Sequence, residues 1–290
     1  YPQKFDILLV LFSDFRKKRL NLHGYYYFKC IMCDIETINP YEEPLTKYFE
    51  TIIDFIHTYN RLNKILLKDA QKYSQEGSIY DATSALVISD WTGSTDNGWK
   101  INYYTGTIKE VNKKNYPDEI SKILSREFGM AYAQCFEAFE TLLKDLIYIK
   151  IQNDHNFKNL LPNNDYSRQS IKGGTDLFKL VRKAGGERFR KYSKENNCKF
   201  RFKEMFTIIS EIRHAITHSK GVLATAKIPN DNYYKALFKY LMPFNDLEGE
   251  KILLKFEYDM FYNLLIYLSE FGYQIFKILS EEDNYECKIL

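Results

Sequence analysis

The sequence predicts a mainly helical protein whose C-terminal part is a bundle of helices, preceded by a smaller α+β region. Two observations support this fold class. From about residue 118 onward, apolar residues recur at intervals of three and four, which is the spacing of an amphipathic helix. Between about residues 84 and 111, β-branched and aromatic residues alternate with turn sequences, which is typical of short antiparallel strands.

The N-terminal region, residues 1–112, is expected to contain a helix followed by a β-meander. Residues 45–74 repeat apolar side chains at helical spacing and end near a Gln-Glu-Gly-Ser sequence. Thr-Asp-Asn-Gly at 95–98 is a strong hairpin turn, and Thr-Gly at 105–106 offers a second turn. We therefore expect a meander over about 84–111, although no residue of this region indicates a chemistry.

The C-terminal region, residues 113–290, has the features of a helical bundle. Polar residues and Pro117 coincide with the change of period, which places the boundary between the two regions near residues 112–116. Gly185 and Gly186 are expected to stop the second helix, and Gly221 to cap the third. The helices are predicted at residues 120–151, 176–185, 200–221 and 253–282.

The composition narrows the class of protein. A hydrophobic content of 45% with 27% charged residues is typical of a soluble globular chain. Five cysteines, an odd number, argue against a disulfide scaffold and favour the reducing cytoplasm. Cys30 and Cys33 have no second pair at zinc-finger spacing, so we expect packed thiols there. The longest apolar run, residues 7–12, is too short to cross a bilayer, and residues 5–15 fit either a strand or a helix.

Positive charge is concentrated in residues 179–203. This stretch holds ten Lys/Arg and two Glu, a net charge of +8, while the whole chain carries +3. Aromatic residues are interleaved with these cations, as in proteins that bind single-stranded nucleic acid. A solvated basic loop with its rings packed into the core would give the same pattern. The candidate RNA-binding residues of this stretch are Lys183, Arg188, Arg190 and Lys191, and the interleaved rings are Phe189, Tyr192, Phe200 and Phe202.

The predicted helix at 200–221 carries an arginine on its apolar side. On a helical wheel, Arg213 falls within a stripe of apolar residues, whereas Glu211, His214 and His218 form a separate polar stripe. A guanidinium in that position is costly unless it is paired or lies at a wet interface. Its stem could be packed while its head reaches solvent or a carboxylate, or the head could enter a subunit interface.

His218 is the candidate for proton transfer. An imidazole changes its charge near neutral pH and can both take and give a proton, although a histidine at a helix end is often only a solvated cap. His214 and His218 have the spacing of two metal ligands on one helix. The zinc-protease pattern would require Glu at position 215, where this chain has Ala215, so no metal is expected.

Arg213, a polar residue at 214 and His218 reproduce the R-[N/D/H]-x-x-x-H signature of HEPN domains, and this region resembles that family. The resemblance covers about residues 118–290. It includes the preceding Phe-Glu-Ala-Phe-Glu-Thr-Leu-Leu segment at 136–143, the apolar run 206–212 that leads into the motif, and a long terminal helix. Residues 1–112 lie outside it.

The resemblance implies a fold and an activity. Catalytic HEPN proteins are helical, dimerise across the motif helix and cut single-stranded RNA by attack of the 2′-OH, without a metal or another cofactor. By this likeness Arg213 and His218 are the catalytic pair, and His214 orients Arg213. The chain would then be an endoribonuclease that acts as a homodimer through the 200–221 helix. It would be a cytoplasmic toxin or antiviral defence effector, restrained by a regulatory protein or an antitoxin.

One position departs from the pattern of HEPN toxins. In those toxins a modifiable tyrosine lies two residues after the histidine, whereas this chain has Lys220, which would add affinity for phosphate instead. A different class of function also remains open. A non-catalytic HEPN-like scaffold that binds RNA or a protein would have Arg213 and His218 in structural roles.

Overall fold

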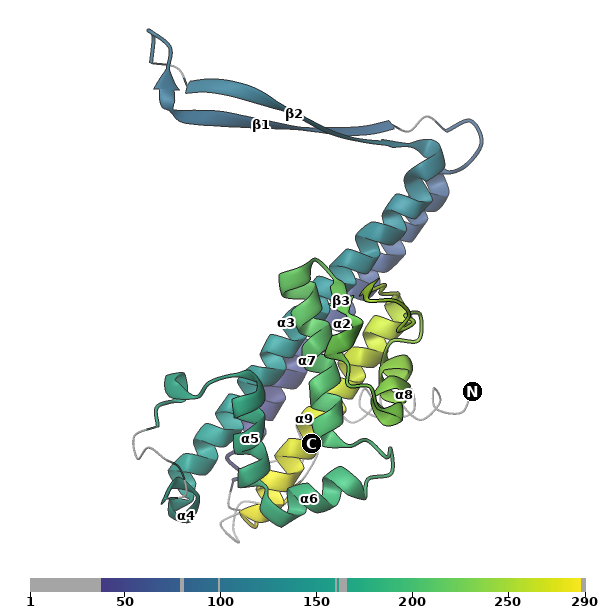
Figure 1. Cartoon of the computed structure of the whole chain (residues 1–290). Helices are drawn as coiled ribbons and strands as arrows, with labels where there is room; N and C mark the ends of the chain where they lie inside the picture. Colours follow the sequence, from purple (N-terminus) through teal and green to yellow (C-terminus); the bar gives the residue numbers. More distant parts are fainter. Residues whose placement is uncertain (1–37, 79–80, 99, 160, 162–165, 288–290) are drawn as a thin grey trace, which may run out of the picture. The chain divides into compact units, whose positions relative to one another are not determined.

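The computed structural model describes residues 38–78, 81–98, 100–159, 161 and 166–287 (Figure 1). Most of these residues are helical, which confirms a mainly helical fold. The apolar run at 5–15 and the pair Cys30 and Cys33 lie outside the described residues. The helices are α2 (Glu42–Tyr73), α3 (Tyr116–Asn153), α4 (His155–Asn159), α5 (Gly174–Ala184), α6 (Gly186–Lys194), α7 (Phe202–Ser219), α8 (Asn232–Leu241) and α9 (Tyr258–Glu282), and the strands are β1 (Asp81–Ser94), β2 (Lys100–Asn112), β3 (Val222–Ala224) and β4 (Lys251–Leu253).

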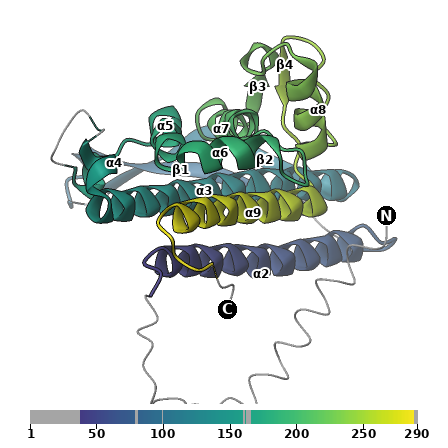
Figure 2. The same ribbon diagram turned by 90° about the horizontal axis from the view of Figure 1, so that it is seen from below.

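Helices α2, α3 and α9 lie side by side and form the centre of the unit that spans residues 40–290 (Figure 2). Their apolar stripes meet in stacked aromatic rings. The rings of Phe128 and Phe261 are 5.2 Å apart, and those of Phe139 and Phe271 are 5.5 Å apart. Because residue numbers rise together in these two contacts, α9 runs parallel to α3. The expected division of the chain near residue 112 stays a prediction, and α2, from the N-terminal side of it, shares this core.

The buried Lys150 is the centre of a polar cluster that links the ends of α2, α3 and α9. Lys150, near the end of α3, has only 3% of its side chain exposed. Its ammonium group pairs with Asp154 at 2.9 Å and with Asp283, which follows α9. The hydroxyl of Tyr41, which precedes α2, donates to the other oxygen of Asp283 at 2.5 Å. Each buried charge therefore has a partner, as burial of an ion requires.

Helices α5, α6 and α7 cover the side of α3 and α9 that faces away from α2 (Figure 2). The ring of Phe178 in α5 stacks on that of Phe206 in α7 at 4.4 Å. The chain turns between α5 and α6 at Gly185, as the sequence predicts. A Cβ at this position would approach Ile278 of α9 to 2.7 Å, so the close contact between this turn and α9 requires glycine.

Strands β1 and β2 form a two-stranded antiparallel hairpin that connects α2 to α3. The predicted turn at 95–98 is present, with the Gly98 N–H donating to the Thr95 carbonyl at 2.8 Å. The expected meander is wrong, because the chain does not reverse at Thr105 and Gly106. Gly106, with φ of 76°, instead lies at an irregularity of the register where β2 carries extra residues opposite Leu86.

The hairpin leaves many apolar side chains in solvent. Because the strands have no further neighbours in their sheet, their outer edges are unpaired within the described residues, and most of their side chains are exposed. Trp91 is 90% exposed. The other exposed apolar side chains of the hairpin are Leu86, Val87, Ile88, Tyr103, Tyr104 and Ile108.

Candidate functional site on helix α7

Helix α7 packs its apolar side on α3 and leaves a polar face outward. The Tyr132 hydroxyl of α3 donates to the Ile209 carbonyl at 2.9 Å, and the rings of Phe136 and Phe206 are 6.2 Å apart. The apolar residues of α7 are buried, namely Phe202, Met205, Phe206, Ile208, Ile209, Ile212, Ala215 and Ile216. The outer face therefore consists of polar side chains, among them the two histidines of the motif.

Arg213 lies between these two sides of α7. Its guanidinium donates to the carboxylate of Glu137 on α3, and its side chain is 27% exposed. Its Nε is buried and has no hydrogen-bond partner in the described part of the chain. The contact that positions Arg213 comes from Glu137 rather than from His214, which makes no hydrogen bond to it among the described residues. One sequence-based alternative, a packed stem whose head meets a carboxylate, describes this geometry.

His214 and His218 lie one turn apart on the exposed face of α7. Their ring centroids are 4.8 Å apart with an interplanar angle of 48°. The helix ends directly after them, where Lys220 adopts a left-handed conformation with φ of 53°. Gly221 was predicted as the cap, and it also has a positive φ, with its N–H donating to the Ala215 carbonyl at 2.9 Å. His218 and Lys220 are thus exposed together at one end of α7.

No metal-ligand set is found near these histidines. Across the part of the chain that the structure describes, no three His, Cys, Asp or Glu side chains come close enough together to hold a metal ion. Glu211, the third ligand that the spacing on α7 would offer, does not complete such a group. An imidazole can transfer a proton or form a hydrogen bond with a ligand.

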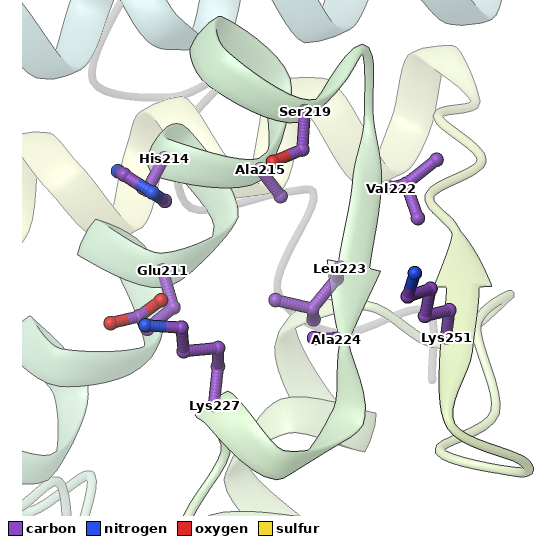
Figure 3. Close-up of a pocket in the computed structure, with 9 residues that line it drawn as sticks. All are labelled: Glu211, His214, Ala215, Ser219, Val222, Leu223, Ala224, Lys227 and Lys251. Carbon is purple, nitrogen blue, oxygen red and sulfur yellow. The ribbon is translucent and has the colours of Figure 1, made fainter.

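A pocket of about 300 Å³ opens beside His214 (Figure 3). One wall is α7, a second wall is β3, and β4 and the short turn at 225–227 complete it. Figure 3 shows the Lys227 side chain extending from that turn toward Glu211 of α7. The lining residues are Glu211, His214, Ala215, Ser219, Val222, Leu223, Ala224, Lys227 and Lys251.

The basic stretch 179–203 is a helix, α6, flanked by parts of its neighbours. Its interleaved rings are largely packed inward. Phe189 and Phe202 are buried against each other, with centroids 5.4 Å apart, so these two rings do not offer a face to a nucleic acid base. The Tyr192 hydroxyl donates to Glu281 at 2.6 Å. The reading in which the rings belong to the core describes this stretch better than base stacking does.

Several cations of α6 are engaged by the protein's own carboxylates. Arg188 lies 3.1 Å from Glu282 and 3.6 Å from Glu281 of α9. Arg190 pairs with Glu187 at 2.5 Å within α6. Lys191 is exposed on α6, and Lys183 is exposed on the preceding helix, α5. Part of the positive charge counted in the sequence is therefore neutralised locally.

The structure does not bring the α6 cations next to His218. Phe189 of α6 contacts Phe202 at the start of α7, whereas His218 is in its last turn. Sixteen residues of α-helix separate Phe202 from His218, which is about 24 Å at 1.5 Å per residue. An RNA strand in contact with both places would have to run the length of α7.

Glu137, Lys227 and Lys251 were not singled out from the sequence. Glu137 is 76 residues away from Arg213, and only the packing of α3 on α7 brings them together. The sequence does carry one signal for this pairing. A carboxylate lies beside the apolar stripe of one helix, and an arginine lies within the apolar stripe of another. Lys227 and Lys251 lie in short elements that carry no periodic pattern.

No protein-family model matches the chain, and no significant match is found among curated proteins or solved structures. No helix within the described residues is long and apolar enough to span a membrane. The function of the α7 face is thus inferred from its own residues and from the likeness of its motif.

Proposed function

We propose that the chain is a metal-independent endoribonuclease of the HEPN type that cuts single-stranded RNA at the outer face of α7. The observation that carries the proposal is the pair of exposed imidazoles, His214 and His218, with ring centroids 4.8 Å apart on a helix that also carries Arg213. Two groups that take and give protons, with a fixed positive charge nearby, are what RNA cleavage through the 2′-OH requires.

The reaction uses the two histidines in complementary roles. One imidazole takes the proton of the ribose 2′-OH, and the 2′-oxygen forms a bond to the adjacent phosphorus. The bond from phosphorus to the 5′-oxygen of the next nucleotide breaks, and the other imidazole, in its protonated form, gives its proton to that oxygen. The products are a 2′,3′-cyclic phosphate and a 5′-hydroxyl. Because the protons balance between the two rings, this scheme requires no metal ion.

Arg213 stabilises the charge that develops on the phosphate oxygens. A guanidinium presents a permanent charge and a fork of N–H donors to phosphate. On an ideal helix Arg213 and His218 are about 140° apart, so one phosphate reaches both more easily across a two-fold axis than within one chain. We therefore propose a homodimer through α7, with the Arg213 of one copy facing the histidines of the other. Light scattering that finds a monomer at micromolar concentration contradicts this arrangement.

The cellular role rests on the likeness to HEPN proteins alone. We propose a toxin or an antiviral defence effector, with RNA as its substrate and a regulatory protein or antitoxin as its restraint. Lys220 beside His218, and the cations of α6 at the far end of α7, would contact phosphates of the bound strand.

A second candidate function is favoured by the ion pair between Arg213 and Glu137. Since Arg213 has a partner within its own chain, its place on the apolar side of α7 is explained without any reaction. In that case the domain is a non-catalytic scaffold that binds RNA or a protein, and Arg213 links α7 to α3.

Cleavage of labelled single-stranded RNA in EDTA separates the two functions. The wild-type protein is expected to cut, and His218→Ala is expected to lower the rate by about 10²–10⁴-fold, because it removes one proton transfer. His57→Ala is the matched control, since His57 is also an exposed histidine within a long helix. RNA with 2′-deoxyribose at the cleaved position should be resistant. Equal cleavage by His218→Ala and the wild type contradicts the proposal, and binding of RNA without cleavage favours the scaffold.

A further inference from the structure

The pocket beside His214 shares one wall, α7, with the proposed catalytic face. Its role as inferred below rests in part on the proposed function. Its volume, about 300 Å³, is at the lower end of the range for small-molecule sites. That space suits one nucleoside and excludes a duplex. Because His214 belongs both to the pocket and to the pair of imidazoles, a ligand in the pocket lies directly next to the histidines (Figure 3).

The floor of the pocket is apolar. Ala215 and Leu223 are buried, the latter with 2% of its surface exposed. Val222 and Ala224 are half-buried on either side of Leu223. An apolar floor beneath a ring of polar groups is the usual composition of a pocket that binds a flat, partly polar molecule.

The polar side chains of the pocket have unused hydrogen-bonding capacity. Glu211, Lys227 and Lys251 take part in no side-chain hydrogen bond or ion pair with the described residues. Some other exposed lysines, such as Lys239 with Asp246 and Lys179 with Asp176, are instead paired with a carboxylate. An acceptor and two cationic donors are therefore gathered at one opening and remain available for a ligand.

We propose that this pocket holds a guanine nucleotide of the RNA strand adjacent to the scissile phosphate, with Glu211 and Lys227 reading the edge of the base. Figure 3 places the carboxylate and the ammonium group on the same side of the pocket and pointing toward each other. Of the four RNA bases, guanine alone presents two neighbouring N–H donors, N1–H and N2–H, followed by a carbonyl acceptor, O6.

Each group of the pocket then has a role. The two oxygens of Glu211 accept from N1–H and N2–H, and Lys227 donates to O6, which is recognition of the Watson–Crick edge of an unpaired base. Lys251 neutralises a phosphate of the strand without reading sequence. His214, at the rim, lies between the base and the reacting phosphate. The site thereby restricts cleavage to positions next to guanine.

Binding of mononucleotides tests the pocket independently of cleavage. Titration of the wild-type protein with GMP, AMP, CMP and UMP, followed by NMR, is expected to show GMP binding at least about tenfold tighter than the others, as for one good bidentate contact to a base. Glu211→Gln should abolish the preference, since an amide offers one acceptor and one donor. Glu204→Gln, two turns earlier on α7 and outside the pocket, should retain it.

The outcomes distinguish this inference from the proposed function. Selective GMP binding by a protein that cuts no RNA supports the pocket and contradicts the nuclease. RNA cleavage at all four bases alike, with no selective GMP binding, supports the nuclease and overturns the guanine site. Equal affinity of all four nucleotides, or a preference that survives Glu211→Gln, also overturns it.

Discussion

The two ends of α7 carry positive charge in different ways. At its start, α6 presents cations of which Arg188 and Arg190 are paired with carboxylates of the same chain. Near its end, Lys227 and Lys251 line a pocket and have no such partners among the described residues. The sequence shows the opposite picture, because residues 179–203 stand out by charge and the two pocket lysines do not.

This difference shows that a dense run of Lys and Arg need not be the surface with the most available charge. A cation already paired with a carboxylate releases fewer counterions from RNA, because its charge is largely compensated before binding. A lysine that forms no ion pair with the described residues, such as Lys251, retains more of its charge for a ligand. The availability of charge therefore depends on tertiary contacts that a residue count does not contain.

Among the predicted effects, the largest is the difference in the salt dependence of RNA binding between charge reversals at the two ends of α7. Lys227→Glu with Lys251→Glu is expected to lower the salt dependence of RNA binding by about 0.7 in log–log slope, because Lys251 contacts a phosphate whereas Lys227 contacts the base. Arg190→Glu with Lys191→Glu should change the slope less, and should leave the cleavage rate at saturating RNA unchanged. Arg188 is left intact because it links α6 to α9.

Filter binding across a salt series measures both slopes. Equal changes for the two double variants would show that the carboxylates around α6 do not compensate its charge. An unchanged slope for Arg190→Glu with Lys191→Glu would remove α6 from the RNA path. Circular dichroism of each variant confirms that the helices are retained.

A double-mutant cycle sharpens the comparison for the motif arginine. Glu137→Gln and Arg213→Gln, alone and together, are expected to give a coupling energy of about 0.5–1 kcal/mol in urea unfolding, since the pair is partly exposed. The exposed pair of Lys179 and Asp176 is the control, with a smaller coupling expected. A coupling energy of zero for Arg213 and Glu137 would show that this ion pair does not stabilise the fold. Arg213 would then be available to bind the substrate.

Acid should weaken the ion pair between Lys150 and Asp154 at the end of α3, with a smaller effect on stability than the changes above. Burial alone would raise the pKa of Asp154, but hydrogen bonds from Lys150 and the Phe157 N–H outweigh it and lower that pKa. The stabilisation is thus present above the unfolded-state pKa of about 3.9 and is lost as the pH falls through the lower folded value.

Because the side chain of Asp154 is 28% exposed and its charge is partly screened by solvent, we expect this loss to be about 1 kcal/mol or less. Urea unfolding of the wild type and of Asp154→Asn at pH 7 and pH 3 measures it. The asparagine still caps α4 but carries no charge, so its stability should change less between the two pH values. An identical acid dependence of the two proteins would show that other carboxylates dominate.

The long helices could be predicted from the sequence because each buries one stripe of apolar residues. The expected helix at 45–74 corresponds to α2, and that at 120–151 to α3. The prediction of a meander is wrong because Thr105 and Gly106 allow a bulge within a strand as readily as a turn between strands. No helix is predicted at residues 186–194, where α6 lies, because its charges hide a short amphipathic pattern that buries only Phe189.

The candidate site could be predicted only where it is local. His214 and His218 share a face of one helix, so their proximity follows from their spacing. The pairing of Arg213 with Glu137, and the pocket closed by β3 and β4, depend on contacts between distant segments. Strands of three residues, such as β3 and β4, carry too few side chains to show an alternating pattern.

The exposed hairpin has a consequence for cooperativity. Strands β1 and β2 bury few side chains against the helices, so their opening costs far less free energy than unfolding of the α2, α3 and α9 core. Amide protons of the ladder between Asp81 and Asn112 would therefore exchange with deuterium through local opening, long before those of Phe128 or Phe139. The hairpin and the bundle belong to one chain, but they form separate units of unfolding.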